Sequence, residues 1–291
     1  FVKLFDPPAA YRSGPGARIS FWLGFEPQET KLEFLSMEGE VLRSFESSAE
    51  GAGRGGGFRG RGFSPEAGLN VFEWNLAGEG AVTFPGMILW GARSTAPIVP
   101  PGRYTVRLTA DGLTDETTVE VRRNPWITDV SDEDMVAQYE FAVRIRDRVD
   151  EANSAVIAIR RMKYQLQERL EGSDDPALAR AAAALDAAAS EVEGMLYQVK
   201  NRAGQDPLNF PIRVNNRLAN LIGMVQRGDG RPNDGMYEVF DIMVERLAGL
   251  TDRLDGVWTN EMSAVDAELR RLGLEELDPW DEDTPILTPS G

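Results

Sequence analysis

Between residues 17 and 123 the chain alternates hydrophobic and polar side chains with a period of two. Tyr104, Val106 and Leu108 alternate with polar neighbours, which is typical of a strand with one face on a core and the other towards solvent. Similar short segments, rich in β-branched and aromatic residues, recur between Gly, Pro, Asp or Glu. They read ARISFWLGF, KLEFLSM, VLRSFES, LNVFEWNL, RYTVRLTA and TTVEVRR.

Two turn signals pair neighbouring segments. Glu38-Gly39 separates KLEFLSM from VLRSFES, and Asp111-Gly112 separates RYTVRLTA from TTVEVRR. Several short strands at this spacing predict a β-sandwich of immunoglobulin or fibronectin-III type over residues 15–124. We expect residues 1–14 to form an extended N-terminal segment.

After Asn124-Pro125 and a linker at 125–130, the hydrophobic period becomes helical. Ser131 followed by Asp134 is a variant of the capping box, and it predicts the start of a long helix that Gly172 ends. The predicted apolar stripe of this helix is Val136, Tyr139, Val143, Val149, Ala152, Val156, Ile159, Leu166 and Leu170.

Three further helices follow. Asp175-Pro176 predicts the second helix, which is rich in alanine, and a third covers about residues 212–226. The fourth is expected to begin at Asn233 or Asp234. Together these patterns predict a four-helix bundle over residues 131–274, followed by an acidic, Pro-rich tail at 275–291 without regular structure.

Composition and charge exclude some classes of function. The 291 residues contain 47 acidic and 31 basic side chains, giving a formal net charge of -16, which disfavours nucleic acid and anionic lipid as general partners. The sequence has no histidine and no cysteine. Ser-His-Asp and Cys-His catalysis, and zinc sites built on these side chains, are therefore excluded. We predict no cofactor. Phe1 is not an initiator methionine, so we expect the numbered chain to be either processed or excised.

The run GAGRGGGFRGRG at residues 51–62 is unusual in so acidic a chain. A phosphate-binding P-loop would need Lys-Ser or Lys-Thr after its last glycine, whereas Phe63-Ser64-Pro65 follows here. An RNA-binding arm would use Phe58 for stacking, but the net charge disfavours it. We predict an elongated loop between two strands that docks on an acidic partner surface. The predicted docking residues are Arg54, Phe58, Arg59 and Arg61, together with Trp280 in the tail.

Other candidate sites have simpler interpretations. The acidic loop from Asp229 to Asp234 lacks the ligand pattern of a calcium loop, and Asn233 or Asp234 as a helix cap explains it. The acidic residues at 132–134 suit the positive end of a helix dipole. The basic residues of the first long helix are expected to pair within that helix on a solvated face. They are Arg144, Arg146, Arg148, Arg160, Arg161 and Lys163.

Four aromatic side chains could belong either to the core or to a sugar-binding platform. We expect Trp74, Trp90, Trp126 and Tyr104 to be sandwich core. Exposed indole rings beside carboxylates would instead suit carbohydrate, and the spacing does not separate these alternatives.

Several segments, taken in order, resemble the region that follows the β-propeller in bacterial sortilin-like proteins, which are often labelled glycosyl hydrolases with neuraminidase-type repeats. The segments are FVKLFDPPAAYR, ARISFWL, EGEVLRSF, AGLNVFEWNL, PPGRYTVRLTADG and PIRVNNRLANL, with Tyr237-Glu-Val-Phe240 opening the last helix. The resemblance spans essentially the whole chain. It implies an exported protein, but the propeller and its Ser-x-Asp-x-Gly-x-x-Trp boxes have no counterpart here, so no family catalytic residue can be transferred.

These observations predict a non-catalytic structural or assembly subunit. We expect it to dock on a larger extracytoplasmic or membrane-associated protein complex, such as the periplasmic face of a photosynthetic reaction-centre or respiratory assembly. We expect its partners to be protein subunits and any membrane association to be peripheral, through those partners. The alternative is a carbohydrate-binding or accessory module of a glycoside-processing enzyme.

Overall fold

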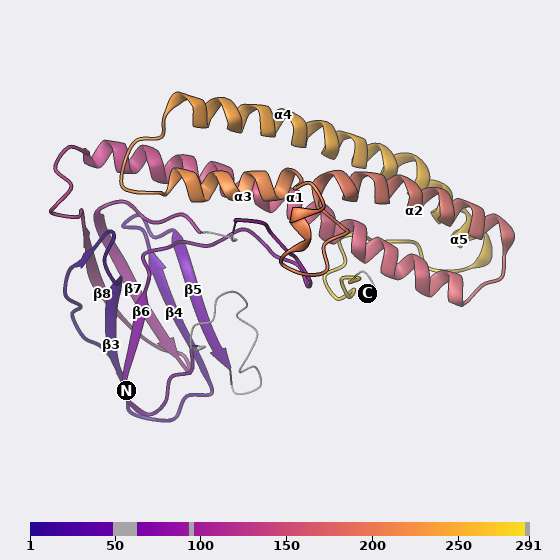
Figure 1. Cartoon of the computed structure of the whole chain (residues 1–291). Coiled ribbons are helices and arrows are strands. Elements are labelled where there is room, and N and C mark those ends of the chain that lie inside the picture. The colour runs from indigo at the N-terminus through magenta and orange to yellow at the C-terminus, as the bar shows by residue number, and fades with distance from the viewer. Residues whose placement is uncertain (49–62, 93–95, 289–291) are drawn as a thin grey trace. The chain divides into compact units, whose positions relative to one another are not determined.

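The chain folds into β-sheets and long helices, as a computed structural model shows (Figure 1). The structure describes residues 1–48, 63–92 and 96–288. Each of the six predicted strand segments forms a strand, and two short strands precede them. The strands are β1 Val2–Leu4, β2 Ala10–Tyr11, β3 Ala17–Leu23, β4 Glu29–Leu35, β5 Val41–Ser48, β6 Gly68–Trp74, β7 Gly102–Ala110 and β8 Leu113–Arg122.

The strands form two sheets. The three-stranded sheet has the order β1-β3-β6, and the five-stranded sheet has the order β2-β8-β7-β4-β5. The pairings are antiparallel except for β2, which lies parallel to β8. Both predicted turns join antiparallel neighbours, with Gly39 between β4 and β5 and Asp111-Gly112 between β7 and β8. All three residues have positive φ, the conformation that such turns require.

One hydrophobic core is built from both sheets. Ile19 and Phe21 of β3 and Leu32 of β4 belong to the same buried cluster, as do Tyr104, Val106 and Leu108 of β7. The alternation predicted for β7 is therefore confirmed. Trp74 is completely buried and stacks on Phe34, with 4.2 Å between ring centroids. Its indole Nε1 donates to the carbonyl of Ala77, so the ring is buried without leaving its polar atom unpaired.

The helical half of the chain begins with a 40-residue helix, α1 Asp132–Glu171. The other helices are α2 Pro176–Leu196, a 3-10 turn at Asp206–Leu208, α3 Val214–Val225, α4 Asp234–Val257 and α5 Ser263–Leu272. A π-helical stretch, Trp258–Met262, joins α4 to α5. The predicted fourth helix is therefore one continuous element with a π-helical interruption. α2 packs against α4 and α5, and α3 packs against α4.

The helix starts follow the predicted caps. The Ser131 hydroxyl accepts from the Asp134 backbone N–H at 3.2 Å, and the Asp134 carboxylate accepts from the Ser131 N–H at 3.1 Å. Asp175 accepts from two N–H groups at the start of α2, and Asn233 accepts from Met236 N at the start of α4. These side chains satisfy backbone donors that the helix itself leaves free, which fixes where each helix begins.

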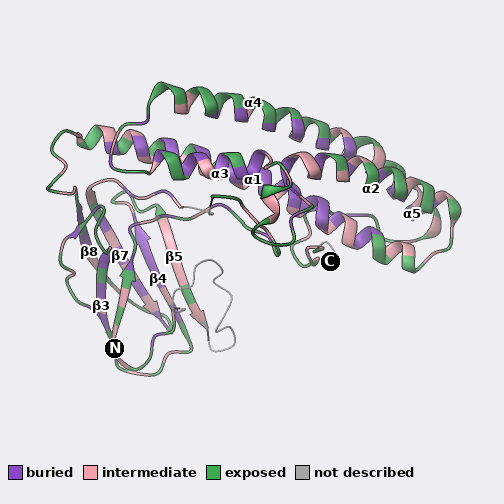
Figure 2. Ribbon diagram, in the orientation of Figure 1, coloured by how far each residue is buried: buried purple, intermediate pink, exposed green. Residues whose placement is uncertain are grey.

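The chain divides into two compact units built from non-contiguous segments. Unit 1 contains residues 1–79, 96–142 and 226–232, and unit 2 contains residues 80–95, 143–225 and 233–291. In Figure 2, buried residues extend along α1, whereas α4 has a face of exposed residues. Among the described helices, none combines the length and apolar character needed to cross a membrane.

Two expectations about aromatic residues are wrong. Trp126 is 90% exposed and Trp90 is 38% exposed, so neither is buried core. Trp126 follows β8 in the segment before α1, where no strand places its side chain inward, and Trp90 lies in a loop of unit 2. The alternation that predicted burial holds inside strands and does not extend to these connecting segments.

Candidate functional site

Four of the five predicted docking residues, Arg54, Phe58, Arg59 and Arg61, lie outside the described residues. The fifth, Trp280, is described and is 59% exposed. Its backbone N–H donates to the Asp278 carboxylate at 2.9 Å, so the backbone is held in a turn while the indole remains accessible.

The described part of the tail, residues 275–288, has no helix or strand, as predicted, but α1 and α5 bind it. The Gln165 amide exchanges two hydrogen bonds with the backbone of Asp278, each of 2.8 Å. Leu277 is buried, and its N–H donates to Asp266 of α5 at 3.0 Å. Burial of the Asp266 carboxyl raises its pKa. These contacts fix the backbone that carries Trp280.

Trp126 is the most exposed of the large hydrophobic side chains that the structure describes. Hydrogen bonds of its backbone fix the position of Trp126. The Trp126 N–H donates to the Asn124 side chain at 3.0 Å, and the Ile127 N–H donates to the Asn124 carbonyl at 3.1 Å. An Asx-type turn at Asn124 therefore presents an indole ring to solvent.

The loop after α3 has a structural role in unit 1. The Asp229 carboxylate accepts from Arg12 Nε at 2.9 Å and from the Ser13 hydroxyl at 3.2 Å. Arg12 also donates to the Val99 carbonyl and to the Gln138 side chain. Within the described ranges, no group of three or more acidic side chains is placed to hold a metal ion. Asp229 is thus engaged by a buried arginine.

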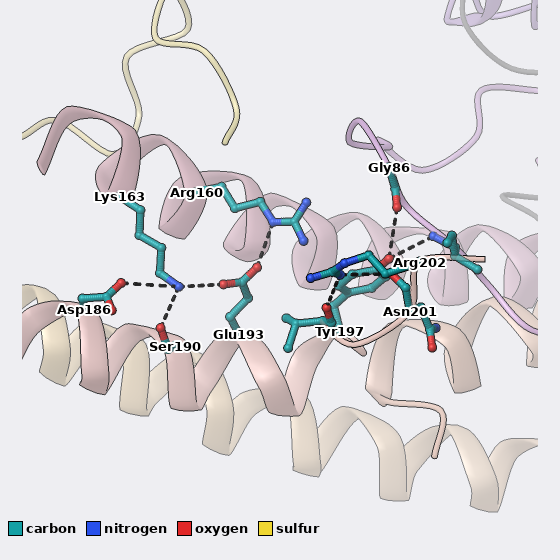
Figure 3. A network of polar contacts seen from close by, with 11 residues as sticks. Gly86, Arg160, Lys163, Asp186, Ser190, Glu193, Tyr197, Asn201 and Arg202 are labelled. Carbon is teal, nitrogen blue, oxygen red and sulfur yellow. Dashed lines mark hydrogen bonds and ion pairs between the residues drawn. The ribbon is translucent and has the colours of Figure 1, made fainter. Parts of the chain in front are cut away.

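A polar network in unit 2 corrects the interpretation of Arg160 (Figure 3). Arg160 is 2% exposed, and its Nε donates to Glu193 Oε1 of α2 at 2.8 Å. The other oxygen of Glu193 accepts from Lys163 at 2.9 Å. Arg160 and Lys163 therefore pair between helices, not within α1 on a solvated face as expected. The expectation holds for Arg146 with Asp147 and for Arg148 with Glu151.

Two aromatic rings pack near the guanidinium of Arg160. Its central carbon lies 4.7 Å from the centroid of Phe84 and 5.4 Å from that of Tyr197. The two rings meet edge to face, with 5.0 Å between centroids. The Tyr197 hydroxyl donates to the Gly86 carbonyl at 3.2 Å and accepts from the Ile88 N–H at 3.0 Å. Tyr197 thereby holds the loop at 84–88 beside the arginine.

The loop is also attached to α3 and α1. Asn216 accepts from Trp90 N at 2.7 Å and donates to Trp90 O at 2.9 Å, and Asn153 donates to Val82 O at 2.7 Å. Asn153 in turn accepts from Asn215 at 3.1 Å. Of the two buried asparagines of PIRVNNRLA, Asn216 therefore holds the backbone at Trp90 directly, whereas Asn215 acts through Asn153.

A pocket of about 220 Å³ lies beside the Arg160 network, within unit 2. Gly86, Met87, Ile88, Arg160, Tyr197, Asn201, Arg202 and Thr288 line it. We call it the Arg160 pocket. Figure 3 shows the guanidinium of Arg160 directed towards the side occupied by Tyr197 and Arg202. The lining combines two guanidinium groups, a phenol and a side-chain amide, which are groups that bind polar ligands by hydrogen bonds.

Sequence reasoning missed this site. By its charge, Arg160 groups with five other basic residues of the first long helix, and Tyr197, Asn201 and Arg202 belong to no recognised motif. One signal was available: Val149, Asn153, Val156 and Arg160 are spaced by four, three and four residues, and all four are buried on α1. Arg160 continues this buried stripe of α1. A buried arginine needs a partner, and on the core-facing side of a helix that partner comes from another element.

Comparisons with known proteins identify no family. No protein-family model matches the chain, and no curated protein is similar enough to match it. Among solved structures, the chain is similar to CopC from Methylosinus trichosporium OB3b, with 15% identity, 43% of this chain and 96% of that chain covered, and a TM-score of 0.21. A similarity at this level supports no conclusion about function.

Proposed function

We propose that this chain is a non-catalytic structural or assembly subunit that docks on a larger protein complex. The observation that supports it best is Trp126, which is 90% exposed while Asn124 fixes its backbone. A tryptophan with both indole faces accessible exposes a large apolar area to water, and tryptophan is among the residues most enriched in the binding hot spots of protein interfaces. A rigid backbone lowers the entropy lost when such a side chain is buried by a partner.

A second apolar surface in unit 1 supports the same proposal. Trp22 of β3 is paired with Leu69 of β6, and both side chains are exposed. Val71, two positions along β6, is exposed as well. Residues two apart on a strand share a face, so these three side chains gather on the outer face of the three-stranded sheet. Exposed apolar clusters of this kind are typical of interaction surfaces.

We also propose that unit 1 contains an immunoglobulin- or fibronectin-III-like β-sandwich. The single core shared by two sheets supports it. So does the Tyr104 hydroxyl, which donates to the Pro100 carbonyl at 2.7 Å, four residues upstream. A tyrosine bonded to backbone a few residues upstream is a feature of such sandwiches. For the helices, we propose an antiparallel four-helix bundle formed by α1, α2, α3 and the continuous α4 to α5 element.

The proposed location is extracytoplasmic, at the periphery of a membrane. It depends on the resemblance to sortilin-like proteins, which are exported. In this proposal the partners are protein subunits of an envelope complex, such as a photosynthetic reaction centre or a respiratory assembly. The net charge of -16 disfavours an anionic lipid headgroup as the docking surface and favours attachment through protein subunits.

Site-specific photo-crosslinking tests the proposal. A photoreactive phenylalanine analogue replaces Trp126 in the full chain expressed in its native source, and crosslinked products are identified by mass spectrometry. We expect one dominant protein adduct that is absent when the analogue replaces Leu208, another exposed apolar residue. Equal, heterogeneous labelling from both positions would contradict a specific interface at Trp126.

A carbohydrate-binding module is the second candidate function, because Trp126 and Trp280 expose their indole rings. Aromatic platforms bind sugar rings by stacking, which changes tryptophan fluorescence. Saturable quenching by a panel of oligosaccharides, lost in Trp126→Ala or Trp280→Ala, would favour this candidate over protein docking.

A further inference from the structure

We propose that the Arg160 pocket binds a small organic anion through its carboxylate or phosphate group. The pocket and the groups that line it lie wholly within unit 2. This site is separate from the surfaces at Trp126 and on the outer sheet face, so its test does not depend on the proposed docking function.

The first argument is hydrogen bonding. Arg160 is buried, yet its Nη1 and Nη2 atoms donate to no acceptor in the part of the chain that the structure describes. Buried polar groups are nearly always paired, because an unpaired donor loses its hydration without compensation. Glu193 occupies the Nε side of the guanidinium, which leaves the edge formed by Nη1 and Nη2. Two parallel N–H groups on one edge match the two oxygens of a carboxylate or phosphate.

The second argument is charge. Arg160 and Lys163 share the buried carboxylate of Glu193, and the other acid near Lys163 is Asp186, which is exposed and 3.7 Å away. Arg202 adds a further guanidinium to the pocket lining, and the described residues of that lining include no carboxylate. The site is therefore locally cationic in a chain with a net charge of -16, and burial strengthens its attraction for an anion relative to an exposed arginine.

The third argument is preorganisation. Tyr197 fixes the loop at 86–88 with two hydrogen bonds, and the rings of Phe84 and Tyr197 contact the guanidinium. Arg202 itself is held by donation from its Nη1 to the carbonyls of Val199 and Asn201. The loop, the two rings and Arg202 are therefore held in place before a ligand binds, and this lowers the entropic cost of binding.

Asn201 indicates what else the ligand carries. Its Oδ1 is buried at the pocket and accepts no hydrogen bond from the described residues. A hydroxyl or amino group on the ligand would supply that donor. A pocket of about 220 Å³ limits the ligand to a small molecule. We therefore expect a small hydroxy acid to bind more tightly than acetate.

Nuclear magnetic resonance of the arginine side chains tests the site directly. The full chain, labelled with ¹⁵N, is titrated with L-lactate, acetate and inorganic phosphate at constant ionic strength, with sodium chloride as the reference. We expect a saturable shift of the Arg160 Nε–H resonance, with lactate binding more tightly than acetate. The lactate and phosphate titrations distinguish a carboxylate ligand from a phosphate ligand. The absence of a saturable shift with all three probes would overturn the proposal, since water alone would then satisfy Arg160.

Variants separate binding from folding. Arg160→Met removes the guanidinium and leaves Glu193 paired with Lys163. Arg202→Ala changes an exposed residue and should leave the fold intact. Because charged hydrogen bonds contribute about 1.5–3 kcal/mol, we expect each variant to weaken calorimetric affinity by roughly tenfold or more. Arg217→Ala, an exposed arginine of α3 outside the pocket lining, is the matched control and should bind like the wild type. Equal weakening in Arg202→Ala and Arg217→Ala would show non-specific attraction and overturn the site.

Discussion

Arg12 Nε donates to Asp229 Oδ1 across 2.9 Å, although 217 positions separate the two residues in the chain. Both side chains are almost completely buried, and the remaining donors of Arg12 reach the Val99 carbonyl and the Gln138 amide. The pair joins the N-terminal segment to the loop between α3 and α4, so residues 226–232 belong to the same unit as the strands.

Removing one member of this pair should strongly destabilise unit 1. Asp229→Ala leaves a buried, uncompensated guanidinium, and we expect a loss of about 3–5 kcal/mol in the free energy of unfolding, measured by urea denaturation. The control is Glu120→Ala, which breaks the exposed pair between Glu120 and Arg122 and should cost far less, because solvent screens an exposed ion pair. Similar losses in the two variants would contradict the burial of the Arg12 pair.

The capping interaction at Ser131 should be measurable in the same way. Ser131→Ala removes the hydroxyl that accepts from the Asp134 N–H, and we expect a loss of about 0.5–2 kcal/mol. Ser131→Thr retains an acceptor and should lose less. Hydrogen exchange at the first turn of α1 checks the location of the effect, because protection of the Asp134 amide should fall in the alanine variant alone.

Stability should depend on pH through Asp266. Burial of the Asp266 carboxyl raises its pKa above the ordinary 3.8 and is the largest effect. The hydrogen bond from Leu277 and the charge of Arg270 lower this pKa, whereas the charge of Glu276 raises it. At pH values between the ordinary pKa of 3.8 and the higher pKa in the folded protein, the folded state therefore binds more protons than the unfolded state. Stability contributed by Asp266 is present at low pH and is lost as the pH rises through that window.

Asp266→Asn keeps an acceptor for Leu277 and removes the titration. The wild type should lose stability relative to this variant as the pH rises from 3.8, as followed by urea denaturation at a series of pH values. For Asp134→Asn the expected pH dependence of stability has the opposite sign. The hydrogen bond from Arg231 lowers the pKa of Asp134, so the stability that Asp134 contributes to the wild type is lost as the pH falls. The same sign in both variants would contradict the assigned causes.

Two tryptophans in unit 1 should respond differently to truncation. Trp74 is fully buried against Phe34, so Trp74→Ala should cost about 3–5 kcal/mol in the free energy of unfolding. Trp126 is exposed, and Trp126→Ala should change this free energy by no more than about 0.5 kcal/mol. A large loss in Trp126→Ala would show that its indole contributes to the fold of the isolated chain and is not reserved for a partner.

The local elements of this fold could be predicted from the sequence because their signals are local. Period-two alternation predicts β7, the pairs Glu38-Gly39 and Asp111-Gly112 predict the two turns, and capping side chains predict the starts of α1, α2 and α4. The two short strands β1 and β2 were missed, since two or three residues give no periodic pattern.

The candidate site could not be predicted from local patterns, because its residues meet only in the folded chain. Arg160 and Glu193 are 33 positions apart, and Tyr197 bonds to a loop more than a hundred positions earlier. The expectation that Trp126 belongs to the core was based on residue type alone. In the structure Trp126 lies outside any strand, and its side chain is exposed. The docking hypothesis for residues 51–62 remains a prediction.

Isolation of the chain from its native membranes in mild detergent is the most direct test of the proposed function. Native mass spectrometry of the isolated material gives the partners and the stoichiometry together. The proposed docking function predicts a stoichiometric complex with envelope proteins, lost in Trp126→Ala while the variant chain remains folded. Recovery of the wild-type chain as a monomer, with no protein bound, would contradict it.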